Sequence, residues 1–169
     1  ANFDWRSNDF RLNQLNFVFE NPLEHEKFNV GYRVDFLVGH DTPFFAANGL
    51  FDRFTGLDPT SGVGQEGIPS YRNVNRIGID LPQFYVDFGI PNFLTRGGVD
   101  FRVGKFYTLM GREVYPAPDT DFYSRTWENV VGTPFTHTGI LATVHATGNL
   151  DLVAGVVEGW DVFEDNNGR

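Results

Sequence analysis

The residue types that most often carry catalysis or bind metals are spread thinly along this chain. It has four histidines and no cysteine, which excludes a disulfide scaffold and a thiolate metal site. His40, His137 and His145 form no spacing comparable to H-x-x-x-H, which places two imidazoles on one ion. On an extended strand His137 and His145 would lie about 26 Å apart. The sequence therefore predicts no metal site and no cofactor.

Two further patterns match ligand-binding motifs in their letters only. Asp119 and Asp121 form a D-x-D pair of the kind that can hold calcium, but so short a pattern is commonplace. Residues 62–67 read G-x-G-x-x-G, the dinucleotide-binding fingerprint. No strand is predicted directly before these residues and no helix directly after them, so we interpret the match as chance. No pair of catalytic acids stands out, and we expect no enzyme.

The charged residues that do have a regular spacing alternate with large apolar ones. Along residues 28–38 every even position is Phe, Val or Tyr, and the odd positions include Asn29, Arg33 and Asp35. This period of two describes a strand with one polar and one apolar face. About nine to eleven tilted residues cross a bilayer as a strand, so the segment has a membrane-spanning length.

The pattern recurs along the chain, clearly in the first four segments and more weakly in the last two, whose facing stays ambiguous. The predicted strands lie near residues 12–20, 28–39, 79–90, 98–107, 137–147 and 150–160. Short polar turns join them in pairs, whereas long segments, 40–78 and 108–136, separate the pairs. Outer-membrane barrels alternate periplasmic turns and extracellular loops in this way. The predicted fold is all-β, an antiparallel up-and-down transmembrane β-barrel. About six strands fall short of the roughly eight of the smallest barrels, so we expect part of a larger one.

Composition and charge agree with this interpretation. The chain has no apolar run of transmembrane-helix length, and its mean hydropathy of -0.27 is mildly polar. A barrel hides its apolar band in alternation, so such an average cannot detect it. The excess of 22 acidic over 13 basic residues argues against nucleic acid as a partner.

Several short motifs of the chain occur in a characteristic order: Phe19-Glu20-Asn21-Pro22, Gly31-Tyr32-Arg33-Val34-Asp35, residues 103–111, Pro116-Ala117-Pro118, Phe122-Tyr123-Ser124, residues 134–139 and Gly159-Trp160-Asp161. Together they resemble the OmpL-like β-barrel porin family of bacterial outer membranes. The resemblance runs from about Leu12 to Asn167, nearly the whole chain. It implies a longer, signal-bearing precursor that closes a pore in the outer membrane, and it supplies no catalytic residues.

The polar phase of the clear strands is expected to line this pore. Those residues are Asn16, Asn29, Arg33, Asp35, Gln83, Asp87, Asp100 and Arg102. A long loop folded into the lumen would add a constriction formed by Arg112, Glu113, Asp119, Asp121, Arg125 and Glu128. The alternative is a capping loop whose charges are simply solvated.

Two positions test the assigned faces. The apolar phase flips at Pro82, which cannot donate to a strand ladder, so a bulge or a strand start is expected at Leu81-Pro82. Lys105 continues the apolar phase after Val103 and is expected to snorkel to the outer interface.

These patterns predict an outer-membrane porin that admits small hydrophilic solutes by passive diffusion. Its partners would be outer-membrane lipid and the solutes themselves, and a homo-oligomer is compatible with the sequence. Two alternatives stay open: a soluble all-β module of the jelly-roll type that binds carbohydrate, and a barrel that acts mainly as a structural or adhesive surface protein.

Overall fold

The computed structural model describes residues 8–42, 46–50, 77–114, 116–122 and 124–164. The G-x-G-x-x-G letters at residues 62–67 and most of the predicted long loop 40–78 lie outside them. Within the described ranges, no helix is long and apolar enough to cross a membrane.

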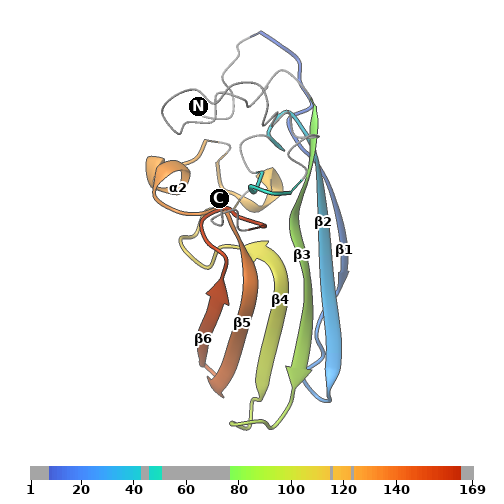
Figure 1. The fold of residues 1–169 in the computed structure, drawn as a ribbon, viewed down its shortest axis with the longest axis vertical. Coiled ribbons are helices and arrows are strands. Elements are labelled where there is room, and N and C mark those ends of the chain that lie inside the picture. Colours follow the sequence, from blue (N-terminus) through green and yellow to red (C-terminus); the bar gives the residue numbers. More distant parts are fainter. Residues whose placement is uncertain (1–7, 43–45, 51–76, 115, 123, 165–169) are drawn as a thin grey trace.

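Six antiparallel strands form one sheet, and each strand pairs with its neighbours in the sequence (Figure 1). The strands are β1 (Leu15–Asn21), β2 (Asn29–Gly39), β3 (Gly78–Ile90), β4 (Val99–Tyr107), β5 (Thr136–Thr147) and β6 (Leu150–Val157). This confirms the predicted all-β, up-and-down antiparallel order. The ends differ slightly, since β1 begins at Leu15 rather than near residue 12 and β6 ends at Val157 rather than near residue 160.

The predicted irregularity at Leu81-Pro82 is confirmed as a bulge in β3. Asp35 of β2 lies opposite Gln83, but Leu37 lies opposite Asp80, so β3 uses one residue more than β2 over this step. The extra residue turns the alternation over, and it does so at the proline, which has no N–H to donate. Apolar side chains on either side of the bulge thereby stay on one face of the sheet.

The strand register also settles the facing of β5 and β6, which the sequence left ambiguous. Arg102 of β4 lies opposite Leu141, Asp100 lies opposite Thr143, and His145 lies opposite Asp151. Leu141, Thr143 and His145 therefore share the face of the charged β4 residues, and Ile140 and Val144 lie on the other face.

Two glycines face each other where the sheet curves at β4 and β5. Gly104 and Gly139 lie directly opposite each other, with φ of 137° and 159°. A Cβ at Gly104 would lie 2.2 Å from the carbonyl oxygen of Phe84, and one at Gly139 would lie 2.1 Å from that of Val156. Only glycine lets neighbouring backbones approach so closely, which allows the sheet to curve here.

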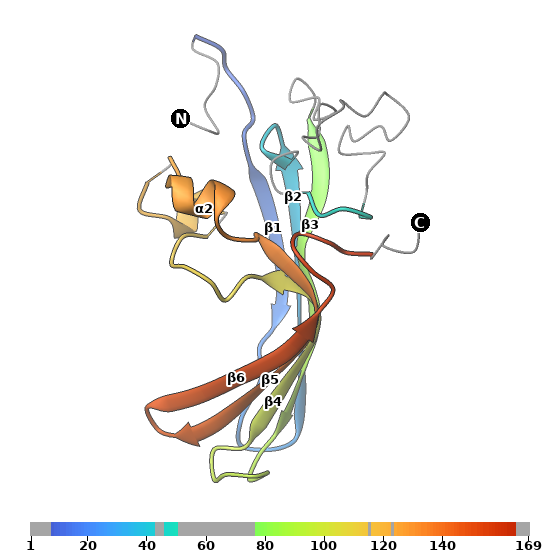
Figure 2. The same cartoon turned by 60° about the vertical axis from the view of Figure 1, so that its left-hand side comes forward.

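The connection between β4 and β5 contains a 3₁₀ turn, η1 (Ala117–Asp119), and a short helix, α2 (Trp127–Val131). In Figure 2, α2 lies on the side of β1–β3 toward which the lower ends of β5 and β6 sweep, which is the concave side of the sheet. The backbone N–H of Ala117 donates to Gln14 Oε1 at 3.0 Å, just before β1 begins. Gln14 is in the same alternation phase as Asn16, so the polar phase faces the concave side.

The opposite face of the sheet is apolar and exposed. Phe17, Phe84 and Ile140, for example, are 48%, 51% and 51% exposed. The other large side chains of this face with substantial exposure are Leu15, Phe19, Val30, Tyr32, Phe36, Ile79, Phe88, Val103, Leu152 and Val156. We call these thirteen residues the apolar band. By contrast, Asp35, Asp80, Gln83 and Lys105 are among the buried residues of the strands.

Candidate pore wall

Polar side chains of the concave face join strand to strand across the sheet. We call this set the polar ladder; it consists of Glu20, Arg33, Asp35, Gln83, Tyr85, Asp87, Asp100, Arg102, His145 and Asp151. Its contacts fall into three groups, which together involve all the strands from β1 to β6.

The first group joins β1, β2 and β3 around Asp35. The Arg33 guanidinium donates to both carboxylate oxygens of Asp35, at 2.8 and 3.1 Å, and lies 3.5 Å from Glu20. Gln83 Nε2 donates to Asp35 Oδ2 at 2.9 Å. Such a bidentate pair fixes the orientation of the guanidinium as well as its position.

The second group joins β3 and β4 around Arg102. Its guanidinium donates to the two carboxylate oxygens of Asp87, both at 2.8 Å. The same guanidinium lies 3.8 Å from the centre of the Tyr85 ring, in cation–π distance. Arg33 lies directly opposite Tyr85 on the next strand. The tyrosine ring therefore separates two arginine side chains along the wall.

The third group joins β4, β5 and β6 around His145. Its Nε2 lies 2.9 Å from Asp100 Oδ2, and its Nδ1 lies 2.8 Å from Asp151 Oδ1. Both ring nitrogens therefore face carboxylates, and His25 from the turn after β1 lies 3.6 Å from Asp100.

The register places the remaining predicted wall residues on the same face without adding them to the ladder. Asn16 lies opposite Leu37, and Asn29 lies opposite Gly89. Sequence reasoning did not select Glu20, Tyr85, His145 or Asp151 for the wall. Glu20 and Tyr85 could have been found from their phase, since Glu20 is in step with Asn16 four residues away and Tyr85 with Gln83 two residues away. The two β5 and β6 residues needed the register.

The family described as "Putative beta-barrel porin-2, OmpL-like" matches residues 1–169. The chain belongs to this porin family. Comparison with curated proteins and with solved structures gave no match. Together with the six-stranded antiparallel sheet, the match confirms the family resemblance and the β-barrel fold class inferred from the sequence.

In this porin-family chain Lys105 does not snorkel to an interface, and that expectation was wrong. Its side chain is fully buried; the ammonium donates to the carbonyl oxygen of Leu81 at 2.8 Å and lies 3.6 Å from Asp80 Oδ1. Asp80 is fully buried too. The bulge at Leu81-Pro82 explains the difference, because it exposes a strand carbonyl that the ladder would otherwise use, next to a carboxylate.

The predicted constriction residues divide into two kinds in the porin-family structure. Glu113 accepts hydrogen bonds from the backbone N–H and the hydroxyl of Thr126, both at 3.1 Å, and Thr126 caps α2. Arg125 is 8% exposed and donates to the carbonyl oxygen of Phe122 at 2.7 Å. These two side chains hold the loop together.

The other four are available to solvent. Arg112 and Asp121 form an exposed ion pair at 3.7 Å, and Asp119 and Glu128 are exposed in η1 and α2. A role for these side chains in a constriction stays a prediction. The contact between Ala117 and Gln14 holds their loop against the polar phase of the wall.

Asp161, beyond β6, anchors the start of β5. Its Oδ1 accepts the backbone N–H groups of Phe135 and Thr136, at 2.6 and 2.8 Å. Burial raises the pKa of Asp161, and the two N–H donors oppose this shift because they stabilise the charged carboxylate.

Proposed function

We propose that this protein forms a water-filled pore in the bacterial outer membrane and admits small hydrophilic solutes by passive diffusion. The proposed transport needs no catalytic residue and no cofactor. The observation that carries the proposal is the opposition of two faces: the polar ladder on the concave side of the sheet and the apolar band on the other side. Soluble sheets bury their apolar face, whereas a barrel in lipid exposes it.

Location in the outer membrane is part of the proposal. Family membership favours it, and so does the length of the strands, since β2 has 11 residues and β3 has 13. Strands of about nine to eleven tilted residues span a bilayer. In such a position lipid would cover the apolar band, and the side chains of the ladder would be hydrated from the lumen.

The polar ladder favours cations among the solutes. Its carboxylates are Glu20, Asp35, Asp87, Asp100 and Asp151, against the guanidiniums of Arg33 and Arg102. Rings of fixed charge at a pore wall attract ions of the opposite sign and repel ions of their own. An excess of carboxylates therefore gives a pore that prefers K⁺ to Cl⁻.

The test is single-channel conductance of the full chain in planar lipid bilayers, with the reversal potential measured across a KCl gradient. We expect discrete conductance steps and a reversal potential of the sign that reports cation preference. Glu20→Gln removes one ladder carboxylate whose ion pair is half exposed, and it should shift the reversal potential toward zero.

The matched control is Glu158→Gln, which removes an exposed carboxylate just after β6, outside the ladder. It should shift the reversal potential less. Membrane-inserted protein without conductance would refute the pore and leave the structural or adhesive role. Conductance with equal shifts in both variants would refute the assignment of selectivity to the ladder.

A further inference from the structure

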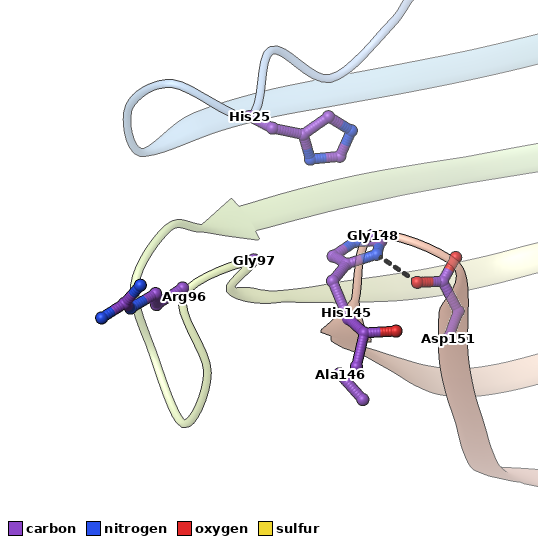
Figure 3. A pocket seen from close by; sticks show the side chains of 8 residues that line it. His25, Arg96, Gly97, His145, Ala146, Gly148 and Asp151 are labelled. Carbon is purple, nitrogen blue, oxygen red and sulfur yellow. Dashed lines mark hydrogen bonds and ion pairs between the residues drawn. The ribbon is translucent and has the colours of Figure 1, made fainter.

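Three tight connections meet at one end of the sheet, the lower end in Figure 1. They are the turns after β1, after β3 and after β5, which end at β2, β4 and β6. A hollow of about 560 Å³ lies there, and His25, Arg96, His145 and Asp151 are among the residues that line it (Figure 3). Residues far apart in the sequence thereby come together at this end of the sheet.

Three side chains of this region converge on one point. His145 Nε2 lies 2.9 Å from Asp100 Oδ2, and His25 Nδ1 lies 3.6 Å from the same oxygen. The two imidazole rings meet edge to face, with their centres 5.3 Å apart. One ligand atom from each of the three residues can be chosen so that all lie within 4.8 Å of one another.

We propose that His25, Asp100 and His145 bind one divalent first-row transition-metal ion of the Zn²⁺ type. Two imidazole nitrogens and one carboxylate oxygen are the donor set that Zn²⁺ and its neighbours prefer, whereas Mg²⁺ and Ca²⁺ prefer oxygen donors alone. Three protein ligands leave a coordination position for water, which the hollow provides. This inference is independent of the proposed pore, since it requires only the fold.

The geometry needs a modest closure. Bonds of about 2.0–2.2 Å in a tetrahedral arrangement place ligand atoms about 3.4 Å apart. Asp100 and His145 already lie closer than that, as hydrogen-bonding partners do, and the ion would take the place of the proton between them. His25 is the ligand that adjusts, because its side chain is 57% exposed and comes from a turn. Figure 3 shows His25 and His145 among the side chains that line the hollow.

Asp151 supplies the support that metal-binding histidines usually have. Its Oδ1 lies 2.8 Å from Nδ1 of His145, on the opposite side of the ring from Asp100. A carboxylate in this position holds the proton on Nδ1, which leaves Nε2 with its lone pair toward the ion, and raises the basicity of the ring. The histidine spacing in the sequence gave no sign of this site, because its ligands come from a turn and two different strands.

The test is calorimetric titration of Zn²⁺ into the full chain folded in detergent micelles. We expect saturable binding of one ion per chain, and Mg²⁺ at the same concentration should not compete. His25→Ala and Asp100→Asn should each weaken binding at least about tenfold, and Asp151→Asn should weaken it about 10- to 100-fold through the orientation of His145. The matched control is His40→Ala, because His40 hydrogen-bonds to Leu12 outside the cluster and its loss should leave Zn²⁺ affinity unchanged.

A second readout separates binding from changes in folding. Co²⁺ in place of Zn²⁺ gives a visible absorption spectrum that reports nitrogen and oxygen donors, and this spectrum should disappear in His25→Ala. His25 is exposed in a turn, so its replacement should leave the fold intact, which unboiled gel migration will show. Absence of saturable binding in the wild type would overturn the proposal. Equal Zn²⁺ affinity of the wild type and His25→Ala would overturn it as well, and would leave the cluster as a hydrogen-bonded group only.

Discussion

The buried pair of Lys105 and Asp80 allows a sharp test of how the sheet is held together. We expect Lys105→Met to lower the free energy of unfolding by about 3–5 kcal/mol, because the Asp80 charge would then be buried without a partner. The distance supports this size. At 3.6 Å, and with an effective dielectric constant of about 20, two unit charges attract each other by about 5 kcal/mol.

The double variant Lys105→Met/Asp80→Leu makes the prediction specific. Replacing both partners of a buried pair by apolar groups is often neutral, so the double variant should unfold close to the wild type. Asp80→Leu alone takes the nearest carboxylate from the buried ammonium of Lys105 and should be destabilising. The coupling between the two single changes should therefore be at least about 2 kcal/mol, with the double variant more stable than the sum predicts.

The assay is reversible urea unfolding in detergent micelles, followed by tryptophan fluorescence and by the mobility of unboiled protein on gels. The dependence on urea concentration should be the same in all four proteins, so that differences in midpoint report stability. Additive effects of the single variants, within about 0.5 kcal/mol, would refute the reasoning. They would mean that the two charges are solvated and do not interact.

Three further predictions use the same unfolding assay. Arg102→Met should lower the free energy of unfolding by about 1–3 kcal/mol, because Asp87 loses a bidentate donor. Arg102→Lys should restore only part of this stability, and full restoration would contradict the bidentate geometry. Gly139→Ala should lower the free energy of unfolding by more than 1 kcal/mol, since its Cβ would lie 2.1 Å from the carbonyl oxygen of Val156. The control is Gly148→Ala, at a turn residue with open space around it. Equal losses of stability in the two variants would argue against a close approach of the backbones at Gly139. Burial raises the pKa of Asp161, so the folded state binds its proton more tightly than the unfolded state, and the wild type should lose stability as pH rises from about 4 through the raised pKa. Asp161→Asn should remove this part of the pH dependence, and an unchanged slope between pH 4 and 7 would contradict the assignment.

Alternation alone predicted most of the sheet. Apolar residues such as Phe17, Val34 and Phe84 alternate with polar neighbours at a period of two. The alternation is strong because the two faces of each strand lie in different environments. The bulge at Leu81-Pro82 was predicted for the same reason, since a proline coincided with a change of phase. In β5 and β6, apolar residues such as Leu141 and Val153 lie on the polar face, so their sequences alternate weakly and only the register reveals the facing.

The contacts that make up the site could not be predicted in this way. Which carboxylate meets Arg102 depends on the strand stagger, and a stagger is not written in either strand by itself. The failure at Lys105 has a related cause. The alternation assigned its side chain to the apolar face. The Leu81 carbonyl and the Asp80 carboxylate that contact its ammonium are brought within reach by the bulge in the neighbouring strand.

The polar ladder also has a consequence for how the strands find one another. Shifting one strand by a single residue would turn Arg33 or Arg102 onto the apolar face. In the proposed membrane position this would cost about 2–4 kcal/mol for each arginine near the bilayer midplane. A shift of β4 by two residues along β3 would keep the facing but move Arg102 about 7 Å from Asp87, so the ion pair of that seam would be lost. Every seam between neighbouring strands has at least one ladder contact that crosses it, so each seam carries its own check on alignment.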